Sequence, residues 1–180
     1  MKLSKSLYTR AIQCQKSLWL KKHNKDVLTP PNAAAQAIFQ NGNEVGDLAC
    51  KLFPNGVEIP YHNTTFQDKI NLTQEYINQG TQNIYEATFE FDGILIMIDI
   101  LNIKDNSVII NEVKSSTQVK DIYLHDASIQ YYVLNGLGYD VKKVNIIHIN
   151  NEYVRDEELD INQLFSIVDV TYEVKELQAN

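Results

Sequence analysis

The stretch Ile94-Leu-Ile-Met-Ile-Asp-Ile-Leu101 decides the fold, because it is apolar throughout except for Asp99. Such a run predicts a buried β-strand, and a carboxylate in a buried strand needs a partner to offset its loss of hydration. A turn at Asp105-Asn106 and a second strand from Val108 follow, which predicts a hairpin. We therefore expect Asp99 to belong to a polar site that the second strand completes.

The second strand carries Glu112-Val113-Lys114. Side chains alternate along a strand, so Glu112 and Lys114 share one face and the hairpin brings both close to Asp99. Oxygen ligands from Asp99 and Glu112, with the backbone carbonyl of Val113, suit a hard cation such as Mg²⁺ or Mn²⁺. Lys114 would lie beside the metal-bound water, which predicts phosphodiester hydrolysis. The alternative is a solvated Glu–Lys ion pair, with Asp99 hydrogen-bonded to a neighbouring turn.

The order Asp99, then Glu112-Val113-Lys114, then a helix carrying Gln130 resembles the PD-(D/E)XK nuclease core of RecB-type nucleases and related CRISPR adaptation exonucleases. Further segments resemble the N-terminal part of an uncharacterised bacterial family with this core: Leu3-Ser4-Lys5-Ser6, 112–116, 125–132 and 148–151. The resemblance spans nearly the whole chain. It implies a restriction-endonuclease-like α/β core that acts on DNA, in a chain that could continue into further domains or bind protein partners.

The resemblance also implies supporting residues. Glu86 matches an acidic residue that precedes the Asp99 strand, and Gln130 matches a helix Gln that shapes the site or contacts substrate. For Glu86 the polar face of an alternating strand is an equally good interpretation, with Tyr85 and Ala87 together on the other face.

The metal-binding His that many relatives carry on an earlier helix falls at Gly46 here. Either Glu44 or Asp47 replaces that His, or the ion keeps fewer protein ligands and more water. The departure leaves a second function open, a catalytically inactive nuclease-like module that binds nucleic acid or a protein partner. A small-molecule-binding α/β domain is a third interpretation, but it leaves Asp99 unexplained.

The length of 180 residues and the hydrophobic content of 44% predict one domain that spans residues 1–180. No apolar run approaches the roughly 20 residues that cross a bilayer, and no signal peptide is recognisable, so we expect a cytoplasmic protein. The two cysteines exclude a four-thiolate cluster within this chain. Cys14 falls where iron–sulfur relatives place their first ligand, but we expect no cluster and expect Cys14 to pack inside a helix.

The net charge of -7 is unevenly distributed. Residues 1–25 contain seven Lys or Arg and no Asp or Glu, and the rest contains nine against 23. We expect this basic segment to contact DNA phosphates through Arg10, Lys16 and Lys21, with Lys120 and Tyr131 nearer the site. The alternative for the basic segment is a solvated helix face.

The periodicity of apolar residues and the turn signals predict an α/β fold with a mixed central sheet flanked by helices. We expect helices over 33–52, over 65–79 with a Thr65–Asp68 capping box, and over 120–135. A strand over 143–150 should pair with the Glu112 strand, and the acidic segment 152–176 should be packed.

Overall fold

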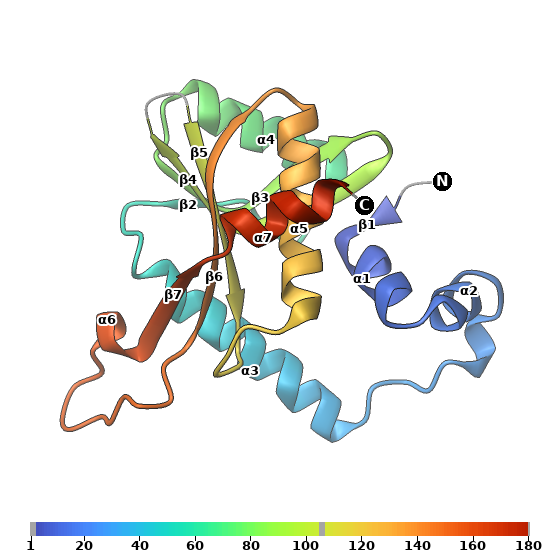
Figure 1. Cartoon of the computed structure of the whole chain (residues 1–180), viewed down its shortest axis with the longest axis horizontal. Coiled ribbons are helices and arrows are strands. Elements are labelled where there is room, and N and C mark those ends of the chain that lie inside the picture. The colour runs from blue at the N-terminus through green and yellow to red at the C-terminus, as the bar shows by residue number, and fades with distance from the viewer. Residues whose placement is uncertain (1–2, 105–106, 180) are drawn as a thin grey trace.

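The computed structural model describes residues 3–104 and 107–179, so the turn predicted at Asp105-Asn106 lies outside the described residues. Within these ranges a mixed seven-stranded sheet is flanked by helices, which confirms the predicted α/β class (Figure 1). The strands are β1 (Leu3–Ser4), β2 (Val57–Glu58), β3 (Asn83–Phe91), β4 (Ile94–Lys104), β5 (Ser107–Lys114), β6 (Asp140–Ile149) and β7 (Phe165–Asp169). Their order is β2-β3-β4-β5-β6-β7, and β1 pairs with β4.

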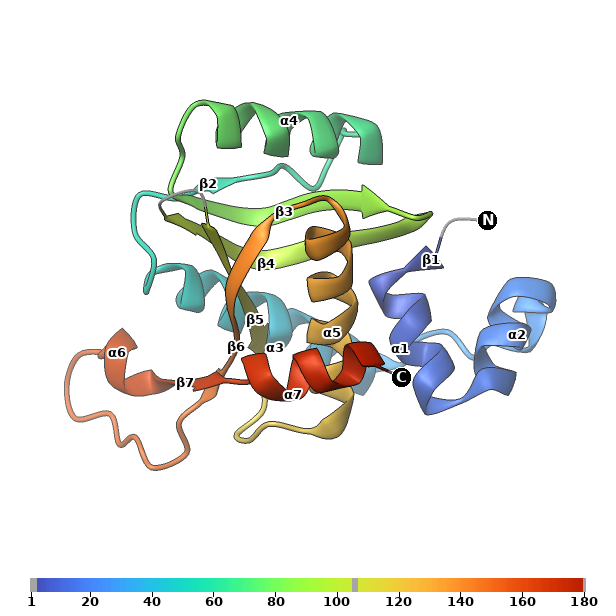
Figure 2. The ribbon, with the colours of Figure 1, turned by 45° about the horizontal axis from the view of Figure 1, so that its top comes forward.

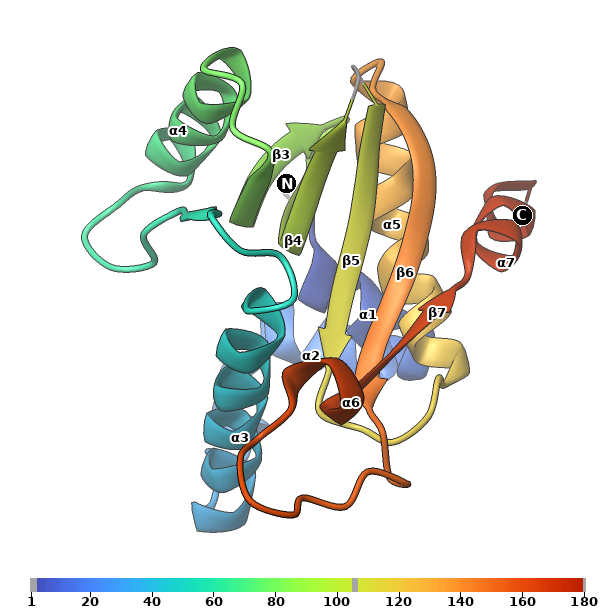
Figure 3. The same cartoon turned by 90° about the vertical axis from the view of Figure 1, so that its left-hand side faces the viewer.

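The helices are α1 (Lys5–Gln13), α2 (Gln15–His23), α3 (Ala33–Cys50), α4 (Phe66–Asn78), α5 (Asp121–Gly136), α6 (Ile161–Leu164) and α7 (Thr171–Glu176), with short 3₁₀ turns η1 (Lys25–Val27) and η2 (Leu177–Ala179). Helix α5 connects β5 to β6, and these two strands pair in parallel, as a crossover helix requires. Figure 3 shows α3 and α5 on opposite sides of β5 and β6.

Two apolar clusters hold these layers together. The larger one joins the sheet to α4, α5 and α7 and includes Ile98, Leu134 and Val174. The smaller one joins the sheet to α3 through Val45 and Ala49. Burial of this apolar surface supplies the main driving force for the fold.

Several predicted elements are confirmed. Thr65 caps α4, and its hydroxyl accepts from the Asp68 amide while Asp68 accepts from the Thr65 amide, so the capping box forms. Gly80 follows that helix with a φ of 78°. The acidic segment is packed only in its later part, where Phe165 and Val170 are buried, whereas Val154 in its first part is 84% exposed.

The N-terminal helices differ from the prediction. Cys14 has extended backbone angles, lies between α1 and α2 and is exposed, so the expectation that it packs inside a helix is wrong. Both helices lie at one side of the sheet (Figure 2). In α3, Ile38 is exposed although Val45 and Ala49 of the same stripe are buried.

Strands β4 and β5 pair from Ile100 and Asn111 as far as Lys104 and Ser107, and the pairing does not extend to Asp99 and Glu112. We call this point the strand fork. On the other side of β4, Leu3 and Ser4 of β1 pair with Ile94 and Leu95. The residues that follow β1 therefore begin α1 close to the open side of the fork.

The β3–β4 ladder is interrupted opposite Asp99. Tyr85 pairs with Ile100 and Ala87 with Ile98, but Glu86 between them has a φ of 57°. As a result Tyr85 packs in the smaller cluster and Ala87 in the larger one. The expectation that Tyr85 and Ala87 share a face is therefore wrong, because a left-handed residue breaks the period of two.

This backbone generates a prediction about Glu86. In a regular strand, a protein with Gly at a given position is less stable than one with Ala there by about 0.5–1 kcal/mol. At a positive φ the order reverses, because the Cβ of Ala clashes with the backbone. We expect Glu86→Gly to be more stable than Glu86→Ala by about 1 kcal/mol in urea unfolding. At Glu90, also in β3, the Ala variant should instead be more stable than the Gly variant, as in a regular strand. A more stable Ala variant at both positions would contradict the prediction.

Candidate functional site

The candidate site lies at the strand fork. Asp99 is one residue before Ile100, the first residue of β4 that pairs with β5, and Glu112 is one residue after Asn111, the last residue of β5 that pairs with β4. The Val113 amide donates to Asp99 Oδ2 at 2.7 Å. The fork thus explains how a carboxylate is accommodated in an apolar strand, although the Asp99 side chain is 27% exposed and less buried than the sequence predicts.

Glu112 is the centre of the site. Its side chain is 1% exposed and accepts hydrogen bonds from three donors. Lys5 Nζ lies 3.0 Å from both carboxylate oxygens, Lys114 Nζ lies 2.6 Å from Oε1, and Gln130 Nε2 lies 2.7 Å from Oε2. These donors come from α1, β5 and α5, so one buried carboxylate ties three elements together.

Asp126 of α5 supplies a further carboxylate. Its Oδ2 accepts from Lys114 Nζ at 2.5 Å, and its Oδ1 lies 3.9 Å from Lys5 Nζ. Lys5 Nζ is also 3.9 Å from Asp99 Oδ1. We call Lys5, Asp99, Glu112, Lys114, Asp126 and Gln130 the carboxylate–lysine cluster.

The three carboxyl groups of the cluster have different proton affinities. Burial, and then the charge of Glu112, raises the pKa of Asp99 to about 6 and that of Asp126 to about 6. Burial would also raise the pKa of Glu112, but Lys114 and Lys5 outweigh burial and hold that pKa below its usual range. Keeping Asp99 and Asp126 ionised near neutral pH therefore costs electrostatic free energy, and a nearby cation lowers this free-energy cost.

Both lysines of the cluster are charged. Burial alone would lower the pKa of Lys5, but the charges of Glu112, Asp99 and Asp126 outweigh it and raise the pKa. The same balance, with Glu112 and Asp126 as the main charges, raises the pKa of Lys114 above its usual value. Neither lysine can act as a neutral base in this arrangement, so their chemical use is as cations.

Glu86 borders the cluster. Burial raises its pKa, Lys5 opposes the shift and Glu112 adds to it, so Glu86 lies within the field of both residues. The interrupted ladder places it opposite Asp99. The structure thus locates Glu86 next to the predicted site.

The site residues predicted from the sequence lie together at the fork, namely Asp99, Glu112, Lys114 and Gln130, with the Val113 backbone beside Asp99. For Val113 the observed contact is that of the amide, whereas the sequence analysis assigned the carbonyl to the metal.

Sequence reasoning missed Lys5 and Asp126 as members of the site. Asp126 precedes Gln130 by four residues, so the helical period puts both on one face of α5, and this signal could have identified it. For Lys5 the local pattern offers no such signal, because the residue enters through the pairing of β1 with β4.

The predicted nucleic-acid-binding residues are spread over several elements. Lys120 adjoins the site, because Lys120 Nζ and Lys114 Nζ lie 5.8 and 5.4 Å from the centre of the Tyr123 ring. Tyr131 instead faces α7, where Lys175 Nζ lies 5.9 Å from its ring centre. The remaining three residues are on α1 and α2, where Arg10 donates to Ser17 and Lys16 is exposed.

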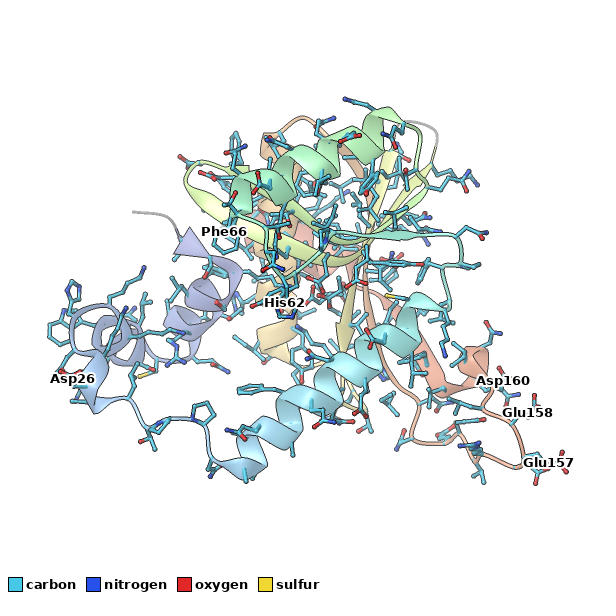
Figure 4. All side chains as sticks on the ribbon, turned by 180° about the vertical axis from the view of Figure 1, so that it is seen from behind. Asp26, His62, Phe66, Glu157, Glu158 and Asp160 are labelled. Atoms are coloured by element: carbon cyan, nitrogen blue, oxygen red, sulfur yellow. The ribbon has the colours of Figure 1, made fainter. Side chains whose placement is uncertain are left out.

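A basic pair of helices and an acidic loop lie far apart in the molecule. The basic helices α1 and α2 lie at one end, and Glu157, Glu158 and Asp160 lie on a loop at the other (Figure 4). The overall negative charge therefore does not describe the surface beside the cluster. Electrostatic attraction of a polyanion would act at the α1–α2 end.

The two residues that the resemblance offers in place of a His at Gly46 lie on α3. Glu44 is exposed and accepts from Gln40 Nε2 at 3.0 Å. Asp47 is also exposed. The pKa of the Cys50 thiol is raised to about 12, mainly by burial of the thiol and next by the negative charge of Asp47. Their assignment as metal ligands stays a prediction.

The carboxylates of the cluster are arranged around ammonium groups. In the described part of the chain, no group of three or more His, Cys, Asp or Glu side chains has an arrangement that could hold a metal ion. The donor set itself is chemically suited to a hard cation, because Asp99, Glu112 and Asp126 all offer carboxylate oxygens. The ammonium of Lys5 stands between these three groups.

Comparisons with known proteins add little. No family model and no curated protein matches the sequence. A solved structure described as "Crystal structure of SSO0001" shares 14% identity over 99% of this chain and 77% of that chain, with a TM-score of 0.39. A likeness that weak carries no argument about fold or function. Over residues 3–104 and 107–179, no helix is long and apolar enough to span a bilayer.

The geometry predicts that Glu112 stabilises the metal-free protein. Glu112→Ala removes the acceptor of Lys5, Lys114 and Gln130 and leaves two partly buried cations without their shared carboxylate. We expect a loss of about 3–5 kcal/mol in the free energy of unfolding, measured in urea with a chelator present. Glu152→Ala, on an exposed loop, should change it by less than about 0.5 kcal/mol. If Glu112→Ala and Glu152→Ala had equal free energies of unfolding, Glu112 would not be the residue that stabilises this site.

Proposed function

We propose that this chain is a divalent-cation-dependent nuclease domain that hydrolyses DNA phosphodiester bonds. The observation that carries the proposal is the convergence of Asp99, Glu112 and Lys114 at the strand fork, with Gln130 bonded to Glu112. These residues also carry the resemblance to the PD-(D/E)XK nucleases. Their oxygen-rich donor set is the type that Mg²⁺ and Mn²⁺ prefer.

In this proposal Asp99 and Glu112 hold the cation. When bound, the ion supplies Lewis acidity and a more acidic water. Lys114, fixed between Glu112 and Asp126, orients the attacking water and stabilises charge on the phosphate. Gln130 keeps the Glu112 carboxylate in one orientation, and Glu86 adds negative charge beside Asp99.

A second function is favoured by two observations. Gly46 stands where relatives carry a metal-binding His, and Lys5 lies between the three carboxylates. Both features fit a catalytically inactive module that retains the fold and binds nucleic acid or a protein partner. Activity and metal binding separate the two functions.

The nuclease proposal predicts cleavage of DNA by the purified protein with Mg²⁺ or Mn²⁺ and none with a chelator. Asp99→Asn, Glu112→Gln and Lys114→Met should each lower the cleavage rate by at least about 100-fold, because each removes a group that acts on the transition state. Conservative replacements are needed because Glu112→Ala is expected to destabilise the fold.

Asp140→Asn is the matched control for these variants. Asp140 is 58% exposed and forms an ion pair with Lys142, away from the cluster. Circular dichroism should show that all variants fold. Wild-type cleavage by the three site variants would refute the assignment of the site, and no cleavage by the folded parent would favour the inactive module.

The proposal also predicts how DNA is held. If Arg10, Lys16 and Lys21 contact phosphates, replacing all three with Gln should weaken DNA binding. Each lost contact should flatten the slope of log affinity against log salt by roughly 0.7–0.9. Anisotropy titrations across a salt series measure both quantities, and Mn²⁺ affinity serves as the control that should not change. Equal slopes and affinities would mean that these helices are only a solvated face.

A further inference from the structure

The ammonium of Lys5 occupies the centre of the carboxylate–lysine cluster. It lies 3.0 Å from both oxygens of Glu112 and 3.9 Å from one oxygen each of Asp99 and Asp126. Lys114, by contrast, is bonded to Glu112 and Asp126. Lys5 is therefore the cation that all three carboxylates share at close range.

The surrounding polar atoms are incompletely satisfied. Asp126 Oδ1 and Gln130 Oε1 are buried, and neither has a hydrogen-bond partner within the described part of the chain. Asp126 is 7% exposed, and its Oδ1 faces Lys5 Nζ at a distance too long for a hydrogen bond. The buried Asp126 Oδ1 is therefore poorly satisfied by the Lys5 ammonium, and a divalent cation that binds carboxylate oxygens at shorter distance would satisfy it better.

We propose that Lys5 is an internal competitor of the divalent cation and that Asp126 becomes a third carboxylate ligand when Lys5 leaves. The proposal rests on the metal site of the proposed function and adds its regulation. A divalent ion carries twice the charge of an ammonium and takes oxygen ligands at about 2.0–2.6 Å, so it draws the same carboxylates closer. The two cations therefore exclude each other.

The movement that the exchange needs is that of a side chain. The backbone beside Lys5 is fixed, because the Leu3 amide donates to the Gly93 carbonyl at 2.8 Å and Ser4 pairs with Leu95. The Lys5 side chain is 20% exposed and has an unbranched stem, which provides a path toward solvent. After release its ammonium remains near the site, on the basic end of the molecule.

The third ligand bears on the His that is missing at Gly46. Asp126 comes from α5, a different helix from the one on which relatives carry their His. It is held by Lys114 through Oδ2, which leaves Oδ1 directed at the position of the Lys5 ammonium. With Asp126 as the third ligand, neither Glu44 nor Asp47 is needed to replace the His.

The test measures Mn²⁺ binding without substrate, by electron paramagnetic resonance of free Mn²⁺ and by calorimetry. Lys5→Met keeps an unbranched side chain and removes the charge, so we expect Mn²⁺ to bind at least about tenfold more tightly than to the parent. The rise in melting temperature on adding Mn²⁺ should also be larger in Lys5→Met. Lys5→Arg, which keeps the charge, should bind like the parent.

Two further variants complete the test. Lys22→Met removes the same charge from α2 and should leave the Mn²⁺ affinity unchanged. Asp126→Asn should weaken Mn²⁺ binding when combined with Lys5→Met. If Lys5→Met were to fold poorly by circular dichroism, Lys5→Gln would serve in its place.

The outcomes separate this inference from the proposed function. Tighter binding by Lys5→Met than by the parent and Lys22→Met supports the competition, including the case in which the parent binds no Mn²⁺. Equal binding by the parent and Lys5→Met overturns the competition and leaves the nuclease proposal standing. Failure of every variant to bind Mn²⁺ overturns both, and an unchanged affinity in the Asp126 double variant overturns its role as a ligand.

Discussion

The burial of one carboxylate, that of Glu112, is the constraint on which the rest of the site depends. A carboxylate that loses its water must be surrounded by donors, and here Lys5, Lys114 and Gln130 supply them. The fork between β4 and β5 provides the room, because the strands stop pairing immediately before this residue. Helices α1 and α5 each contribute a donor to this carboxylate, which adds to the apolar packing of α5 against the sheet.

Local sequence patterns predict much of this arrangement. The apolar run around Asp99 and the alternation over Glu112 and Lys114 are properties of neighbouring residues, and the hairpin makes them neighbours in space. The capping box at Thr65 is an equally local signal. They could be predicted because each depends on a few residues close together in the chain.

The features that escaped prediction depend on contacts between distant segments or on backbone angles that the residue type does not indicate. Glu86 adopts a positive φ, which few non-glycine residues do, so strict alternation placed Tyr85 on the wrong face. Cys14 lies between two helices and not inside one, because its extended backbone separates α1 from α2. Lys5 belongs to the basic segment 1–25 in the sequence, and only the pairing of β1 with β4 brings its ammonium to the acidic residues.

The contact between Lys5 and Glu112 joins residues that are 107 positions apart in the chain. Closing so long a loop costs more conformational entropy than forming the β3–β4–β5 meander, whose strands are adjacent in sequence. The meander is therefore expected to form early in folding and the N-terminal segment to dock late. Until it docks, the three carboxylates lack the Lys5 ammonium that they share in the folded chain. A cation present during folding would thus meet an open site, whereas one added afterwards meets a site that the chain has already closed.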